Sequence, residues 1–592
     1  MGDGIMSDGI LESWRAAITP RRCRASLRTL LVLVPVAIGS VTCAAQSRPE
    51  PLHANQNLDG ILSYIHNGWD SLTRSTTSCS GIHDTKLSTK PVLYLPAEFE
   101  QPKELAEMQR DCGVTIEHLP QVIHQLGTVD VESIHRAGLL YLRNKYVVPG
   151  GRFNEMYGWD SYFIIRGLLR DGRLDLARGM VENFFFEIEN YGALLNANRT
   201  YYLTRSQPPF LSSMVMAVHE AQKAAGQDDH VWMETAYSYV KRDHATWTRE
   251  AHLAGDTGLS RYYDFGEGPA LEALQDETGI YRHVAAYFLF HPTFPAYMAD
   301  ASDVAGGKAA GASFSIHVCE EQSNANSRES CEAPRLIKLK PDYYKGDRSM
   351  RESGFDISFR FGPYGAATHH YAPVCLNSLL FKTERDLEEM SRQLGKTSDA
   401  SEWHKLAGAR KQAVQKYLWN EKQGLFFDYD FDSAQMSTYR YATTFYPLWA
   451  GLATDEQARA VVSHLSAFER PGGIATSTQE SLGQWDYPFG WAPIQLLAAE
   501  GMRRYGYNAD ADRVSVKFLA TVFRNFQRDG TIREKYDVVT RSSETNVKVG
   551  YAANIIGFGW TNATFVELLH SLPPEKAAQV TAATQPPGTV AQ

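Results

Sequence analysis

The sequence predicts an all-α protein whose helices close into a toroid around one site. Apolar residues recur at three- and four-residue intervals through most of the 592-residue chain, as core-facing helices require, whereas strand-like alternation is short and rare. Clusters of Trp, Asp, Arg and Gly lie between these segments at wide intervals, as expected if several loops converge on one pocket. A solenoid, the alternative for many successive helices, would spread such residues along one surface.

The N-terminal segment has the pattern of a signal peptide. Four arginines precede an apolar run at 30–38, and small residues follow at 44–45. The run is too short to span a bilayer as a permanent helix. We therefore predict a signal peptide over 1–45, a periplasmic or secreted location, and no stable membrane insertion after its removal.

The rest of the chain is predicted to form a single domain over 61–572. It is bounded by polar segments at 46–60 and 573–592, a linker and a tail that we expect to be disordered. Amphipathic periodicity is clear from Leu174 to Ile188. Further helices are expected at 209–226, 231–250, 375–395, 401–418, 443–465, 491–506, 510–527 and 560–571.

Composition narrows the range of partners. The formal net charge is −9 and no long basic run exists, which argues against nucleic acid, because phosphate binding needs a concentrated basic face. The 11% aromatic content suits a carbohydrate site and equally an aromatic-rich core. We expect a monomer that binds a small molecule.

Five cysteines follow the predicted leader. Cys319 and Cys331 bracket a polar stretch, and Cys79 and Cys112 flank another loop-like region, so export predicts a disulfide for each pair. Cys375 lies in an apolar helix pattern and is expected to be a buried thiol.

Two motifs bring sugar-binding residue types together. The first is PGGRFNEMYGWDSY at 149–162, where Arg152 and Asp160 can donate to and accept from sugar hydroxyls and Trp159 can cover an apolar sugar face. A structural Arg–Asp pair would explain the first motif, taken alone, equally well. The second is QWDYPFGWAP at 484–493, directly before an apolar helix.

Both motifs resemble the signatures of the trehalase family of glycoside hydrolases, and the similarity extends over about 140–572. Further resemblance is found in NRTYYLTRSQPPF (198–210), RESGFD (351–356), REKYD (533–537) and GFGWTN (557–562). The resemblance implies an (α/α)6 toroid with loop insertions and an inverting hydrolysis of the disaccharide α,α-trehalose to two glucose molecules. It also implies Asp356 as general acid, Glu534 as general base and a substrate pocket formed by Arg152, Phe153, Trp159, Asp160, Asn196, Arg205, Ser206, Gln207, Glu272, Gly354 and Trp485.

Inversion needs a protonated carboxyl on the leaving oxygen and a carboxylate that activates water from the opposite face, about 6.5–9.5 Å apart. It needs no metal and no organic cofactor. His369 and His370 are adjacent candidates for metal ligands. We predict no metal site there, because neighbouring side chains on a strand or loop point apart and no carboxylate pattern accompanies them.

Two departures from the family pattern concern the substrate. Ala270 stands where the family carries an arginine, in GPALEAL at 268–274, and VKVGYAANII at 547–556 lacks the Gly-Glu-Tyr carboxylate. The alternatives are therefore a toroidal glucosidase acting on another short α-glucoside, or a catalytically impaired sugar-binding protein. Retention of both Asp356 and Glu534 argues against the binding protein, which has no use for that pair.

Overall fold

The computed structural model describes residues 58–83, 90–276, 279–291, 297–300, 315–318, 335–551 and 553–582. The predicted signal peptide and the predicted Cys319–Cys331 disulfide lie outside these residues. No helix in the described part of the chain is long and apolar enough to cross a membrane.

Helices from along the whole sequence close into a ring. Within the described residues, six helices contact one another in the cyclic order α4–α6–α11–α13–α16–α18, and α18 returns to α4. Their bounds are α4 Gly158–Arg170, α6 Leu211–Ala224, α11 Val374–Gln393, α13 Tyr446–Trp449, α16 Ala492–Arg504 and α18 Gly559–Ser571. This closed ring confirms the predicted helical toroid.

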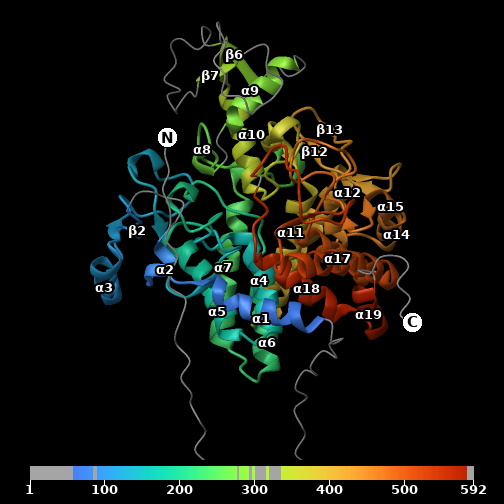
Figure 1. Ribbon diagram of the computed structural model, residues 1–592, viewed down its shortest axis with the longest axis horizontal. Helices are drawn as coiled ribbons and strands as arrows, with labels where there is room; N and C mark the ends of the chain where they lie inside the picture. Colours follow the sequence, from blue (N-terminus) through green and yellow to red (C-terminus); the bar gives the residue numbers. More distant parts are fainter. Residues whose placement is uncertain are drawn as a thin grey trace, which may run out of the picture. The chain divides into compact units, whose positions relative to one another are not determined.

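A second set of helices packs against the ring: α1 Asp59–Leu72, α5 Leu174–Asn190, α7 His230–Trp247, α12 Thr397–Tyr417 and α17 Asn508–Asp529. The two sets differ in burial as their sequences require. In α18 every residue from Gly559 to Leu569 is buried, whereas α12 buries Ala400, Trp403, Ala407, Arg410 and Val414 at helical spacing. Figure 1 shows α1 beside α18, so the first described helix packs against the last helix of the ring.

Three boundaries differ from those expected. The segment 443–465 is not one helix: α13 ends at Trp449 and α14 covers Asp455–Ser463, because Gly451 has a φ of 72° that a helix cannot contain. The helix α1 begins inside the predicted linker. The expectation of disorder is also wrong for α19, Pro574–Ala582, which packs against α17.

A small parallel sheet precedes the ring. Strand β2, Val92–Leu95, pairs with β3, Thr115–His118, and α3, Lys103–Cys112, connects them.

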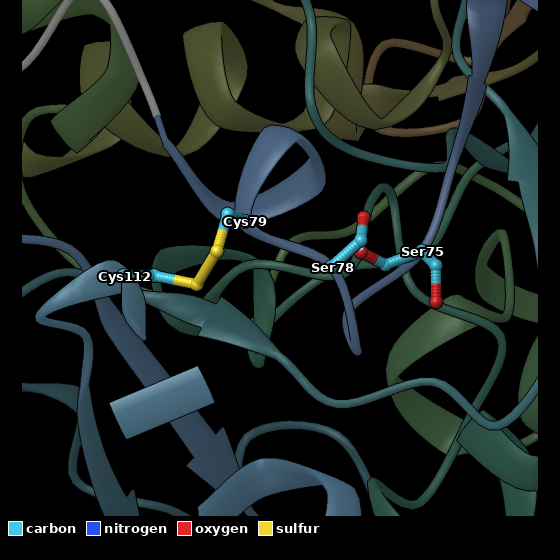
Figure 2. Close-up of a disulfide and its surroundings, with 4 residues drawn as sticks. All are labelled: Ser75, Ser78, Cys79 and Cys112. Carbon is cyan, nitrogen blue, oxygen red and sulfur yellow. Dashed lines mark hydrogen bonds between the residues drawn. A yellow bond between two sulfur atoms is a disulfide. The ribbon is translucent and has the colours of Figure 1, made fainter. Parts of the chain in front are cut away.

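Figure 2 shows the disulfide between Cys79 and Cys112, the last residue of α3, which confirms that predicted pair. In the preceding turn the hydroxyl of Ser78 donates to the carbonyl oxygen of Ser75. Cys375 is a buried free thiol, as expected.

Of the remaining elements, α10 (Pro341–Glu352) and the antiparallel pair of β16 (Phe489–Trp491) and β17 (Lys535–Asp537) matter most for the site. The others are β1 Thr73–Arg74, α2 Cys79–Ile82, β4 Leu139–Leu140, β5 Tyr146–Val147, α8 Leu271–Asp276, α9 Ile280–Phe290, β6 Met298–Asp300, β7 Ser315–Val318, β8 Arg335–Leu339, β9 Tyr371–Ala372, β10 Trp419–Asn420, β11 Leu425–Phe426, β12 Tyr429–Asp430, β13 Gln435–Met436, α15 Leu465–Phe468, β14 Glu469–Arg470 and β15 Gly473–Ile474.

Candidate active site

One cavity gathers almost all of the predicted site residues. The space between its walls, counted together with the open solvent at its mouth, has a volume of about 800 Å³. The predicted residues that line it are Arg152, Phe153, Trp159, Asp160, Asn196, Arg205, Gln207, Glu272, Gly354, Asp356, Trp485 and Glu534. They come from loops and helix ends spread over nearly 400 positions, which only the closed ring brings together.

Ser206 is the predicted site residue that does not line this cavity. Its hydroxyl donates to the carbonyl oxygen of Leu194 at 2.6 Å, and its amide donates to Oε1 of Glu352 at 3.2 Å. The other oxygen of Glu352 accepts from the amide of Tyr263 at 2.6 Å. Ser206 therefore supports the loop behind the cavity, between its lining neighbours Arg205 and Gln207.

The loop that carries Asp356 follows α10 directly. Gly354 has a φ of 75°, and a Cβ at this position would lie 2.9 Å from the ring of Trp159, so the loop requires glycine here for both reasons. The next side chain, Phe355, is buried against Trp159 and Trp485, with ring centroids 5.5 and 5.1 Å away. The carbonyl oxygen of Asp356 accepts from Nε2 of Gln484 at 2.6 Å. The backbone beside Asp356 is thus fixed from both sides.

Glu534 is the residue directly before β17, and it lines the cavity. Its side chain is almost fully buried. Oε2 lies 3.2 Å from Nζ of Lys535, and Oε1 accepts a short hydrogen bond from the Tyr551 hydroxyl. Burial and the Glu534 charge both raise the pKa of Tyr551, so its hydroxyl keeps the proton that it donates. A carboxylate with one cation and one hydroxyl donor fixed on it is held in a single orientation.

Lys535 connects the two loops. Nζ lies 3.2 Å from Oε1 of Gln484, the same side chain that holds the Asp356 carbonyl. Burial lowers the pKa of Lys535, against the opposing effect of Glu534. Pairing of Trp491 with Lys535 between the antiparallel strands β16 and β17 sets this position.

Asp160 brings a third carboxyl group to the cavity from the first turn of α4. Burial raises its pKa well above its usual range, and the charges of Glu534 and Asp356 raise it further. Asp160 therefore keeps its proton more readily than an ordinary aspartate does. A protonated carboxyl can donate a hydrogen bond as well as accept one.

Arginines line the side of the cavity near α8. Arg205 makes a short hydrogen bond to Glu272 and lies 3.4 Å from Oδ2 of Asp264. Although burial opposes it, the charges of Arg205, Arg351 and Arg348 hold the pKa of Glu272 below its ordinary value. Ala270, where the family pattern has an arginine, is fully buried. Arg351 from the end of α10 lines the cavity.

Seven lining residues were not predicted as site residues: Pro149, Tyr157, Tyr202, Arg351, Tyr551, Phe558 and Trp560. All but Tyr551 lie inside the motifs that resemble the family signatures. The motifs therefore indicated that these segments belong to the site, but not which of these residues line the cavity. Tyr551 follows Gly550 in the segment whose missing carboxylate was noted, and nothing in its own pattern marks it.

The second sequence motif supports the cavity more than it lines it. Asp486 is buried and accepts hydrogen bonds from the Ser358 hydroxyl at 3.0 Å, the Phe359 amide at 2.8 Å and the Ser481 hydroxyl at 2.6 Å. Burial raises the pKa of Asp486 to about 6. Its carboxyl group ties the segment after Asp356 to the motif.

The chain matches known proteins over most of its length. A family model described as Trehalase covers residues 69–573. The cytosolic neutral trehalase of Beauveria bassiana is 35% identical over 84% of this chain and 71% of its own length, and that of Saccharomyces cerevisiae is 34% identical over 86% and 72%. The solved structure of neutral trehalase Nth1 from Saccharomyces cerevisiae has a TM-score of 0.70 and 30% identity, and the match covers 89% of this chain and 96% of that one.

These relatives correct one prediction from the sequence. The arginine-flanked apolar run predicts a periplasmic or secreted protein, but the similar proteins are named cytosolic neutral trehalases and point to the cytoplasm. The prediction of export is therefore wrong. A short apolar run after basic residues is only a compositional pattern, whereas these relatives match 84% and 86% of this chain.

Proposed function

The chain belongs to the trehalase family of glycoside hydrolases, and from this premise we propose that it hydrolyses α,α-trehalose to two glucose molecules by inversion. The observation that carries the proposal is the convergence of Asp356 and Glu534 on one buried cavity walled by Trp159, Trp485 and Trp560. Flat apolar walls with a few convergent polar groups are typical of a sugar site.

In the proposed reaction Asp356 donates its proton to the oxygen between the two sugars as the bond from that oxygen to the anomeric carbon breaks. Glu534 accepts a proton from a water molecule, whose oxygen bonds to the same carbon from the opposite face. One glucose leaves with the Asp356 proton on its hydroxyl, and the other carries the hydroxyl from water. A proton exchange with solvent then restores both carboxyl groups.

The surrounding residues support this division of roles. Lys535 and Tyr551 hold the Glu534 carboxylate in one orientation, and a charged base is the form that accepts a proton. Asp160, with its raised pKa, can donate to a sugar oxygen, while Arg152, Arg205 and Arg351 supply donors for hydroxyl groups around the rings.

A substrate panel tests the proposal. Glucose release from trehalose is compared with release from maltose, kojibiose, nigerose and isomaltose, and we expect trehalose to give the highest kcat/KM. A higher value for another disaccharide would support the toroidal glucosidase, and binding of trehalose without turnover would support the sugar-binding protein.

Proton NMR of the early products tests the stereochemistry. Inversion at one anomeric carbon yields β-glucose alongside the α-glucose that is released unchanged. If α-glucose is the sole early product, the proposed inverting mechanism is wrong even if trehalose is the substrate.

A further inference from the structure

Two adjacent histidines and an aspartate converge on one point at the start of α10. Nε2 of His369 lies 3.0 Å from Oδ1 of Asp342, and Nε2 of His370 lies 3.5 Å from the same oxygen. One ligand atom from each of the three residues lies within 4.8 Å of the other two. On a strand or an irregular loop these adjacent histidines would point apart. The 3₁₀ turn Thr368–His370 instead brings their rings to a centroid distance of 3.8 Å.

We propose that Asp342, His369 and His370 bind a divalent transition-metal ion of the zinc type. Zn–N and Zn–O distances of about 2.0–2.1 Å put neighbouring ligand atoms of a tetrahedral site about 3.3 Å apart, which matches the two measured separations. Two imidazoles and a carboxylate suit zinc better than calcium or magnesium, which prefer oxygen ligands alone.

The surroundings fit a cation in two respects. Nδ1 of His370 contacts Asp432, an arrangement in which a carboxylate orients a ligating histidine. Asp430 lies beside Asp432, whose amide donates to Oδ1 of Asp430 at 3.0 Å. Arg261 is an opposing cation, and its guanidinium donates to the carbonyl oxygen of His369 at 2.8 Å.

The site is accessible, and it is separate from the catalytic cavity. The Asp342 side chain is 47% exposed and that of His370 is 26% exposed, which leaves room for water as a fourth ligand. Asp342 lies in the first turn of α10, whereas the loop with Asp356 leaves the other end of this helix, about 18 Å away along its axis. The ion would therefore join α10 to the turn at 368–370 and to Asp432, as a structural site.

Metal binding to the full-length, untagged chain tests the proposal. The protein is stripped with EDTA, exchanged into buffer, and titrated with ZnCl₂ by calorimetry; bound zinc is counted by elemental analysis after gel filtration. We expect one zinc ion per chain and a Tm that rises with free Zn²⁺, because an ion that binds only the folded state stabilises it. Co²⁺ in place of Zn²⁺ should give a visible absorption band.

Four variants separate this site from adventitious binding. His370→Ala and Asp342→Asn should each abolish the stoichiometric zinc, the Tm rise and the cobalt band, and the exposed Asp342 can change without loss of fold. Asp432→Asn should weaken binding about 10- to 100-fold. His404→Ala is the matched control: His404 lies 3.2 Å from Glu388 without a second histidine, and its loss should change nothing.

The proposal is wrong if the stripped chain takes up no zinc, or if the His370 and Asp342 variants bind it like the parent chain. Neither result depends on hydrolysis, so failure here leaves the proposed function untouched.

Discussion

The hydroxyl of Tyr551 donates a hydrogen bond to Oε1 of Glu534, and this contact links the loop before α18 to the proposed base. Glu534 is held on its other oxygen by Lys535 at 3.2 Å. The segment around Tyr551 departs from the family pattern by lacking a carboxylate, yet it supplies this donor. The contact makes Tyr551 a positioning residue for the proposed base.

Tyr551→Phe keeps the ring and removes the hydroxyl. A hydrogen bond to a charged group is worth about 1.5–3 kcal/mol, so we expect kcat to fall about 10- to 100-fold, with little change in KM. Steady-state kinetics on trehalose measure both constants. A rise in KM with unchanged kcat would mean that Tyr551 contacts the substrate and does not position Glu534.

Asp356→Asn and Glu534→Gln remove the proposed acid and base while keeping shape and most hydrogen bonding. Each role is typically worth about 10²–10⁴-fold in rate, so each variant should lose at least that much kcat with its circular dichroism unchanged. Glu402→Gln, at a side chain that is 62% exposed, is the control and should match the parent chain. Turnover like that of the parent in either test variant would show that the residue is not the acid or base.

Chelation should leave hydrolysis unchanged. The proposed reaction uses two carboxyl groups and no metal, and the proposed zinc site lies at the far end of α10. We therefore expect EDTA to lower the Tm of zinc-loaded protein without lowering kcat at a temperature well below that Tm. Loss of activity that a divalent ion restores would contradict the metal-free mechanism.

Asp243→Asn should stabilise the protein at alkaline pH. Both carboxylate oxygens of Asp243 are buried without a hydrogen-bond partner in the described residues, and burial raises its pKa to about 7 from an ordinary 3.8. Between these two values the folded chain holds a proton that the unfolded chain has lost, so stability falls as pH rises. At pH 8 the full penalty, about 4 kcal/mol at 1.36 kcal/mol per pKa unit, opposes folding.

Urea unfolding at pH 5 and pH 8 measures this difference. The gain from Asp243→Asn should be larger at pH 8, and it should stay below the full penalty because the amide is also buried without partners. Asp111→Asn, at an exposed side chain of α3, should change stability equally at both values of pH. An equal effect of Asp243→Asn at the two values would exclude a raised pKa.

Short sequence patterns predicted much of the fold and most of the residues that line the cavity. The helical periodicity of 174–188 became α5, and twelve of the thirteen residues predicted for the site line the cavity. Such patterns can be recognised in the sequence because the burial of one helix face and the chemistry of a loop depend on residues that are close together in the chain. A local pattern also gave the wrong prediction of export, from the apolar run at 30–38.

The sequence by itself determined which residues could perform the chemistry and which segments could form helices. Only the tertiary structure decided which of them meet. Gln484 reaches the Asp356 carbonyl across 128 positions, Arg351 enters the cavity from α10, and His370 turns toward Asp342 instead of away from His369. Each of these contacts depends on closure of the helical ring and on how its loops pack, and packing between distant segments leaves no periodic trace in the chain.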